Sequence, residues 1–339
     1  MRGRLRHIVW VALLGFAAAG CDFRPLADMN NVSYVRVYVD EHILNVTEGF
    51  YNPDFQHPAY VRPEIFRVAL YDAGSGDLVT ERYLRHQGDD ERGHYYDGYL
   101  IVDPGTYHFS AWNFGTETTI VGKEKQFFGA DAYTREIYTR NRSGNESIRY
   151  DADHLFVADR QDIVIQRHET IDTLRNENGD PFFLARSVVK SYYLQIGIKG
   201  SQWLSSATSL LNGVAADVRL YDRSLGEEGE ATLAFGMTRG KLQDAEDHAC
   251  IYTTFGTFGR LEGTSSDLRV TFEVVTTYGQ RFEVTIPMDE VWLTQDALER
   301  QWLIIDQEIE IPEPPPAPGG GGMDPGVEDW GDIESDIVI

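Results

Sequence analysis

Hydrophobic and polar residues alternate along much of the chain with a period of two, which is the pattern of half-buried β-strands. The first clear example runs from Val32 to Val39, where Val35 and Val37 share a face with Val39. The same pattern predicts strands at residues 65–71, 78–84, 95–102 and 106–114. Turn sequences separate them, such as Asp103-Pro104-Gly105, in which proline presets φ and glycine accepts a positive φ. We therefore expect the first half to be β-structure.

The second half repeats the strand pattern after a stretch of different composition. Residues 122–182 are polar and rich in Arg, Asp and Asn, and the strand-like run that they contain is Ile163 to Ile165. We interpret them as a long excursion between strands that includes a domain junction. Beyond them, Trp203 to Leu211 is predicted to form a short helix capped by Ser201. Strands are predicted at residues 188–198, 214–221, 231–237, 268–277, 280–287 and 303–311.

The regular strand spacing predicts an all-β protein made of two tandem β-sandwich domains. The expected N-terminal sandwich covers residues 21–165 and carries the polar excursion, and the C-terminal sandwich covers residues 166–311. A Leu-Tyr-Asp triplet occurs in each half, at residues 70–72 and 220–222. The triplet agrees with a repeat, but it also suits any strand that leads into a turn.

Residues 312–339 have a composition of their own. Prolines concentrated in residues 312–318 predict a stiff spacer, and Gly319 to Gly322 predict a flexible joint. From Met323 to Ile339 the chain has six acidic residues and no basic residue, which is typical of a solvated acidic tail. The last residues alternate again and end in three β-branched side chains, Ile337-Val338-Ile339. The alternative is therefore a terminal strand that has apolar side chains to bury.

The first twenty residues have the features of an export signal. Arginines at positions 2, 4 and 6 precede an apolar run from Ile8 to Ala19, and the run ends in small residues before Cys21. This arrangement resembles the bacterial lipoprotein signal, in which the cysteine is lipidated, with palmitate among its acyl chains, and becomes the first mature residue. The alternative is an ordinary secretory signal. The second cysteine, Cys250, then has no partner and is expected to be buried and inert.

Composition and charge narrow the classes of partner. The 339 residues include 30 Lys and Arg against 54 Asp and Glu, a net charge of -24, so a nucleic-acid partner is not expected. Two cysteines exclude a disulfide scaffold or a multi-cysteine metal site. Aromatic residues form 12% of the chain, which is too many for a wholly disordered protein.

No sequence motif for catalysis is present. The chain lacks His-Glu-x-x-His, Gly-x-Ser-x-Gly and a phosphate loop, so we expect a protein that is not an enzyme and needs no cofactor. His86 and His94 flank the sequence Gly88-Asp89-Asp90-Glu91, which we interpret as a solvated hairpin tip and not as a metal site. Asp151-Ala152-Asp153 lacks the glycine and the downstream glutamate of a calcium loop. No metal ion is predicted.

Several short motifs are spread over nearly the whole mature chain. They are Val68-Ala69-Leu70-Tyr71-Asp72, Pro104-Gly105-Thr106-Tyr107, Trp112-Asn113-Phe114-Gly115, Thr253-Thr254-Phe255-Gly256-Thr257-Phe258-Gly259, and the ending from Gly320 to Trp330. Together with Cys21 they resemble the fimbrillin superfamily of Bacteroidota, and most of all its minor, anchor-like fimbrial lipoproteins.

The resemblance implies two transthyretin-like, Ig-like sandwiches and a mode of assembly. In that family, lipidated precursors reach the outer membrane, and Arg-specific proteolysis removes a first strand from the stalk subunits. The emptied groove accepts the terminal strand of the next subunit, whereas anchor-type members keep their lipid. Arg62 is the best candidate for a proteolytic site, and the candidate donor strand contains Trp330, Ile333, Ile337 and Ile339. The acidic tail and the lack of an obvious Arg site favour an anchor or a cell-surface lipoprotein that does not polymerise.

We therefore expect a fimbrial (pilus) anchor or minor subunit, attached to the outer membrane at the cell surface through the lipid on Cys21. Its partners would be other fimbrillin-like subunits, which it would contact by β-strand addition. The alternative is a solitary surface lipoprotein that binds a glycan or a host protein. In that case Tyr95, Tyr96 and Tyr99 could form a sugar-stacking face, although a half-buried strand explains them more simply.

Overall fold

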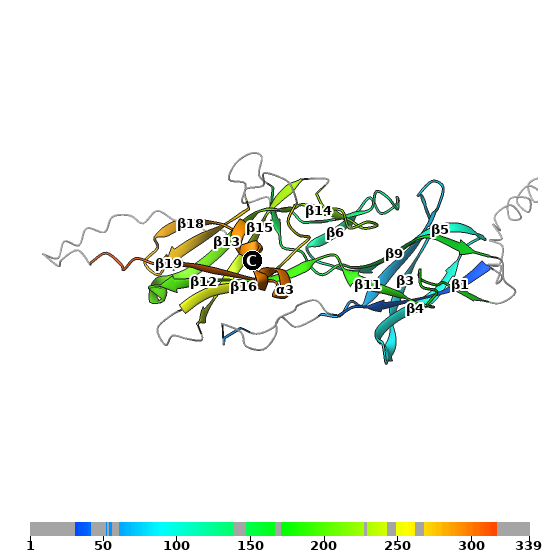
Figure 1. Cartoon of the computed structure of the whole chain (residues 1–339), viewed down its shortest axis with the longest axis horizontal. Helices are drawn as coiled ribbons and strands as arrows, with labels where there is room; N and C mark the ends of the chain where they lie inside the picture. The colour runs from blue at the N-terminus through cyan, green and yellow to red at the C-terminus, as the bar shows by residue number, and fades with distance from the viewer. Residues whose placement is uncertain are drawn as a thin grey trace, which may run out of the picture.

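The computed structural model describes residues 31–41, 52, 54–55, 61–137, 147–166, 171–226, 229–242, 249–261 and 268–316. These residues form two β-rich lobes that lie end to end along the longest axis of the molecule (Figure 1). The helices among them are short: α2 (Asp289–Trp292), α3 (Gln295–Arg300) and the 3₁₀ turn η3 (Ser201–Trp203). The predicted all-β class is confirmed. Within the described part of the chain, no helix has the length and apolar character needed to span a bilayer.

The N-terminal lobe is a sandwich whose two sheets share strands at both edges. Residues 78–85 of β3 pair with β2 in one sheet, and residues 86–90 pair with β4 in the other. At the opposite edge, β11 pairs first with β1 and then with β9. The strands of this lobe are β1 (Val32–Val39), β2 (Ile65–Asp72), β3 (Leu78–Asp90), β4 (Gly93–Ile101), β5 (Gly105–Phe114), β9 (Phe156–Ile165), β10 (Asp172–Thr173) and β11 (Phe183–Ser187).

Side-chain alternation builds the core of this lobe. The predicted strands near residues 32–39, 65–71, 78–84, 95–102 and 106–114 correspond to β1 to β5. In β1 the alternate residues Val35 and Val37 are fully buried, and Phe66, Phe109 and Tyr96 pack into the same cluster. The central strands β2 and β5 are buried over most of their length, because one face lies in this core and the other face, with Ala69, Tyr71 and Trp112, lies in a second buried cluster.

The C-terminal lobe is a second sandwich built in the same way. Its corner strand is β15, whose residues 230–237 pair with β13 and whose residues 238–241 pair with β16. Trp292 and Ala297 from the helices join its core. Its strands are β12 (Lys190–Lys199), β13 (Leu204–Ala215), β15 (Glu230–Lys241), β16 (Ala249–Thr257), β17 (Arg269–Thr276), β18 (Arg281–Pro287) and β19 (Trp302–Glu310), with the short β8 (Ile148–Tyr150) beside β15.

The helix predicted at residues 203–211 is wrong. This segment begins with η3 and continues as β13, which pairs with β15 on one side and β17 on the other. Leu211 and Val214 are fully buried in the core. Position between two strands, with burial on both faces, outweighs the weak local preference of this Ser- and Leu-rich sequence. The helices occur later, where Thr294 Oγ1 caps α3 by accepting from the Ala297 N–H at 3.2 Å.

The polar excursion contains a central strand that the sequence pattern did not predict in full. The ten-residue β9 pairs with β5, and its alternation is broken because the register shifts between Tyr107 and Phe109. Asp162, in the bulged part of β9, has φ of 54°. The pairing of β10 and β11 also extends the N-terminal lobe to Ser187, beyond the expected boundary at residue 165, while β8 from the excursion pairs in the C-terminal lobe.

The two lobes meet in a shared three-stranded sheet. It combines β6 (Thr119–Gly122), which leads into the excursion, and β7 (Asp131–Thr134) from the excursion with β14 (Asp217–Arg219) from the C-terminal half. Figure 1 shows β6 and β14 between the lobes. Beneath them lies a buried cluster, called here the junction cluster, with residues from both halves: Ala69, Tyr71, Trp112, Phe127, Ala130, Ala132, Ala152, Leu155, Val157, Val188, Val189, Ala215, Val218, Leu220, Phe258 and Leu261.

Candidate functional site

Strand β1 lies inside its sheet and has a hydrogen-bonded neighbour on each side. Val32 to Tyr38 pair antiparallel with β4, while β10 and β11 pair with the other edge in parallel. The inward side chains of Val35 and Val37 fill the lobe's core. Removal of β1 would therefore uncover two strand edges and an apolar floor. An alternating strand of similar length could restore both sets of interactions.

Arg62, the candidate proteolytic site, lies between β1 and β2, so cleavage there would separate β1 from the rest of the lobe. Its side chain is 40% exposed, and its Nε lies 3.5 Å from Glu41 Oε1. Its Nη2 contacts His94 Nε2. The structure thus places this arginine at the surface beside the β3–β4 hairpin, where it already has an acidic partner.

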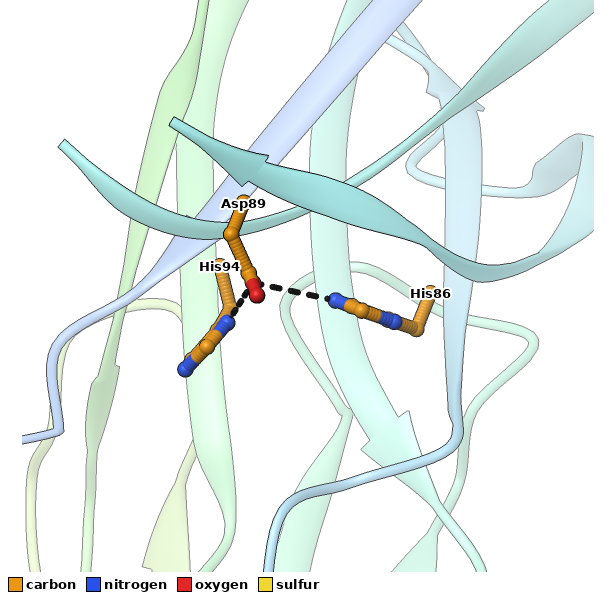
Figure 2. A group of neighbouring side chains, drawn as sticks. All are labelled: His86, Asp89 and His94. Atoms are coloured by element: carbon orange, nitrogen blue, oxygen red, sulfur yellow. Dashed lines mark hydrogen bonds and ion pairs between the residues drawn. The ribbon is translucent and has the colours of Figure 1, made fainter. Parts of the chain in front are cut away.

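The β3–β4 hairpin brings together the two histidines that the sequence suggested only as a solvated tip. Both imidazoles of His86 and His94 point at the Asp89 carboxylate (Figure 2). His86 Nε2 lies 3.3 Å from Asp89 Oδ1, and His94 Nδ1 hydrogen-bonds the same oxygen. One ligand atom from each residue lies within 4.8 Å of the others. We call these three residues the hairpin cluster.

A β-bulge explains why the hairpin cluster converges. Asp89 pairs directly with His94, but the register shifts between His86 and Gly88, where His86 pairs with Tyr96. The extra residue puts His86 and Asp89 on the same face, although an uninterrupted strand would place them on opposite faces. Tyr96 also anchors the nearby 61–64 segment, because its hydroxyl donates to the Pro63 carbonyl.

Burial and charge set the protonation of His94. Burial lowers the pKa of His94 below its ordinary value, while the nearby Glu41 carboxylate acts in the opposite direction. Glu41 Oε1 lies 3.2 Å from His94 Nε2, on the side of the ring away from Asp89. His94 therefore has a carboxylate near each ring nitrogen.

The predicted tyrosines divide between the two faces of β4. Tyr96 is buried in the core, whereas Tyr95 and Tyr99 lie on the outer face. There the outer residues of β1 pair with them, so that Tyr34 meets Tyr99 with ring centroids 5.5 Å apart, and Arg36 lies over the Tyr95 ring at 4.1 Å. This ordered aromatic and charged face contains Tyr99 as its exposed ring.

A polar groove runs along β9 and β11 at the junction of the lobes. It has a volume of about 810 Å³ and is lined by both signs of charge, including Asp159, Arg160, Arg186 and Lys190. Arg223 from the C-terminal half donates to Asp159 Oδ1 at 2.6 Å. Burial raises the pKa of Asp159, and Arg223 opposes that shift. The ion pair thus ties the two halves together beside the junction cluster.

The other predicted site residues lie elsewhere. Cys21 and the candidate donor-strand residues Trp330, Ile333, Ile337 and Ile339 fall outside the described residues. Cys250 is buried in β16 as predicted, and burial raises the pKa of its thiol to about 12. No sequence pattern indicated Glu41 as a neighbour of His94, because the two residues are far apart in the sequence and meet only through folding.

Comparison with known proteins adds a family likeness to this geometry. No family model matches the chain. The chain is 23% identical to the "Putative fimbrium anchoring subunit Fim4B" of Bacteroides ovatus, over 92% of this chain and 91% of that protein. The resemblance to fimbrial proteins is confirmed.

The chain is also similar to solved structures. A crystal structure of a "putative adhesin" from Bacteroides ovatus superposes with a TM-score of 0.55 at 18% identity, covering 87% of this chain and 98% of that one. The fimbrial anchor protein Mfa2 from Porphyromonas gingivalis is 13% identical, with a TM-score of 0.44 and coverage of 80% and 88%. The first of these shares the all-β fold described above.

Proposed function

We propose that this protein is a non-catalytic, lipid-anchored subunit of a fimbrium at the bacterial cell surface, with an anchoring or minor structural role. The observation that carries the proposal is the end-to-end similarity to a protein named as a fimbrium anchoring subunit. The two-lobed all-β architecture agrees with it. The alternation of β1 and its two-sided pairing supply the structural element on which strand exchange would act.

Attachment to the outer membrane would use the lipid on Cys21. The signal-like residues 1–20 and the small residues before Cys21 support this step. Expression in a Bacteroidota host with labelled palmitate tests it. Wild-type protein should incorporate label and partition into detergent, and Cys21→Ser should do neither. Equal labelling of the variant would disprove lipidation at this cysteine.

Contact with other subunits would use β-strand addition by residues 330–339. The alternating apolar residues Ile333, Ile337 and Ile339 suit the pockets along a sheet edge, while main-chain hydrogen bonds supply affinity. The chain leaves the C-terminal lobe through β19, an edge strand, and residues 311–316 follow it toward the tail. The Pro- and Gly-rich spacer gives the terminal segment reach from this edge.

A pull-down from native envelopes tests the tail as a connector. Full-length protein should capture fimbrillin-like chains, and deletion of residues 323–339 should abolish capture. Replacement of Ile333, Ile337 and Ile339 by Asp should have the same effect. The matched control replaces the acidic positions of the same segment by amides: Asp332→Asn, Glu334→Gln and Asp336→Asn. Unchanged capture by the Ile variants would refute strand addition by this segment.

The outer face of β1 and β4 supports a second candidate, which is binding of a glycan. Tyr99 is 52% exposed there and lies next to polar partners, a combination that suits stacking on a sugar. Tyr99→Ala should then abolish retention on a glycan array, whereas Tyr83→Ala, which removes a ring 48% exposed on β3, should not. Loss of retention in both variants, or in neither, would count against this face.

A further inference from the structure

The hairpin cluster has the donor set of a transition-metal site. Two imidazole nitrogens and one carboxylate oxygen converge, from His86, His94 and Asp89. Zinc is bound in proteins by such nitrogen and oxygen ligands, and three protein ligands are typical of a site that keeps a fourth position open. Calcium and magnesium favour oxygen ligands, so two imidazoles argue against them.

The distance between His86 and Asp89 fits a small tetrahedral ion. Ligands about 2.0–2.1 Å from such an ion lie roughly 3.3 Å apart, and His86 Nε2 is 3.3 Å from Asp89 Oδ1. The hydrogen bond between His94 Nδ1 and Asp89 has to open for an ion to enter. The Asp89 side chain is 57% exposed and can rotate to allow this.

The surroundings of His94 resemble the outer shell of a metal site. A metal-bound histidine commonly donates its other ring N–H to a carboxylate, which fixes the tautomer and the orientation of the ring. Glu41 Oε1 lies 3.2 Å from His94 Nε2, the nitrogen that would remain free. Arg62 contacts both this nitrogen and Glu41. Its long side chain therefore has to move aside before Glu41 can accept a hydrogen bond from the Nε2–H of His94.

From this geometry we infer that His86, Asp89 and His94 form a binding site for a zinc-like divalent cation, with Glu41 orienting His94. The ion joins β3 to β4 at the bulged end of the hairpin and leaves a coordination position for water or for a side chain of a partner. The inference is independent of the proposed fimbrial role, because it depends on this cluster alone.

Zinc titration of the full mature chain tests the inference, with isothermal calorimetry and competition against a chromophoric chelator as readouts. Wild-type protein should bind one zinc ion at this site. His86→Ala and His94→Ala should each weaken that binding at least tenfold, and Glu41→Gln should weaken it by about 10–100-fold. Glu91→Gln, which removes an exposed acid from the same hairpin, should leave it unchanged.

Spectroscopy separates a built site from general attraction to an acidic surface. X-ray absorption of the zinc-loaded wild type should show two imidazole ligands. Thermal melts in chelator should show that the variants remain folded. Zinc binding that the histidine variants do not reduce, or that Glu91→Gln reduces equally, would overturn the inference, as would the absence of imidazole ligands.

Discussion

Among single substitutions, we expect one at Phe127 to weaken the connection between the two lobes most. It follows β6 in the excursion, is 2% exposed, and belongs to the junction cluster. Its ring lies 5.5 Å from that of Tyr71 in β2 and 5.9 Å from that of Tyr221, which follows β14. It also stacks on His108 at 4.6 Å. Phe127→Ala therefore removes contacts with both halves of the chain at once.

The expected cost follows from this burial. Truncation of a buried phenylalanine to alanine costs about 3–5 kcal/mol, depending on how far the cavity can collapse. Here Phe128 and Tyr221 lie at the solvent side and can relax inward, so the lower end, about 3 kcal/mol, applies. With an unfolding entropy of about 2.1 cal/mol/K per residue, this corresponds to a fall in Tm of roughly 4 °C for the 339-residue chain.

Calorimetry and hydrogen exchange measure the effect, and the neighbouring phenylalanine is the control. Phe128→Ala removes the same number of atoms from a ring that is 44% exposed, so it should change Tm much less. Amides of β7 and β14 should lose protection in Phe127→Ala, because their pairing joins the two halves over this cluster. Amides in β1 and β12 should keep theirs, since separate cores hold them, whereas β2 contributes Tyr71 to the junction cluster.

If Phe127→Ala and Phe128→Ala lower Tm equally, burial in the junction cluster is not what holds this region. If β1 and β12 lose protection together with β7, the lobes unfold as one unit and the cluster is not a separate connection.

Other expected outcomes concern buried groups of the C-terminal lobe and the junction. Because burial raises the pKa of Cys250 to about 12, its thiol should resist alkylation in the folded protein and react after denaturation; rapid native labelling would contradict its burial. Burial also raises the pKa of Asp151, opposed by the Gly256 N–H, so the folded state holds this proton more tightly than the unfolded state. The contribution of Asp151 to stability should then rise as the pH falls from neutral toward about 3.9, and Asp151→Asn should raise Tm at about pH 7 with a smaller gain in acid. Gly256→Ala should lower the free energy of unfolding by about 1–3 kcal/mol, because a Cβ would lie 2.0 Å from the Ala152 carbonyl oxygen. Denaturant unfolding measures this change, and an unchanged midpoint would show that the contact relaxes.

Most of the strands could be predicted because their positions in the sequence alternate without interruption. In β1 the inward valines and outward tyrosines already distinguish core from surface. Alternation did not predict β9 in full, because the bulge at Asp162 interrupts it. It did not predict β13 either, because residues 209–211 and 213–215 are all buried and this half of the strand lacks a two-fold pattern. The divided roles of Tyr96 and Tyr99 follow from alternation alone, and the structure confirms them.

The hairpin cluster could be predicted only in part. The sequence indicates a hairpin with two histidines and an acid between them, but an ideal strand would direct His86 away from Asp89. The bulge, and the approach of Glu41 and Arg62 from the β1–β2 connection, depend on how distant segments pack.

By itself, the sequence determined the all-β class, the positions of most strands and the likeness to fimbrial proteins, because these properties depend on local alternation and on short motifs. The tertiary structure decided which strand pairs with which: the central position of β1, the sheet shared between the lobes, and the convergence of His86, Asp89 and His94. Pairing between distant segments is set by the shape and burial of the whole sandwich, and no local pattern encodes it.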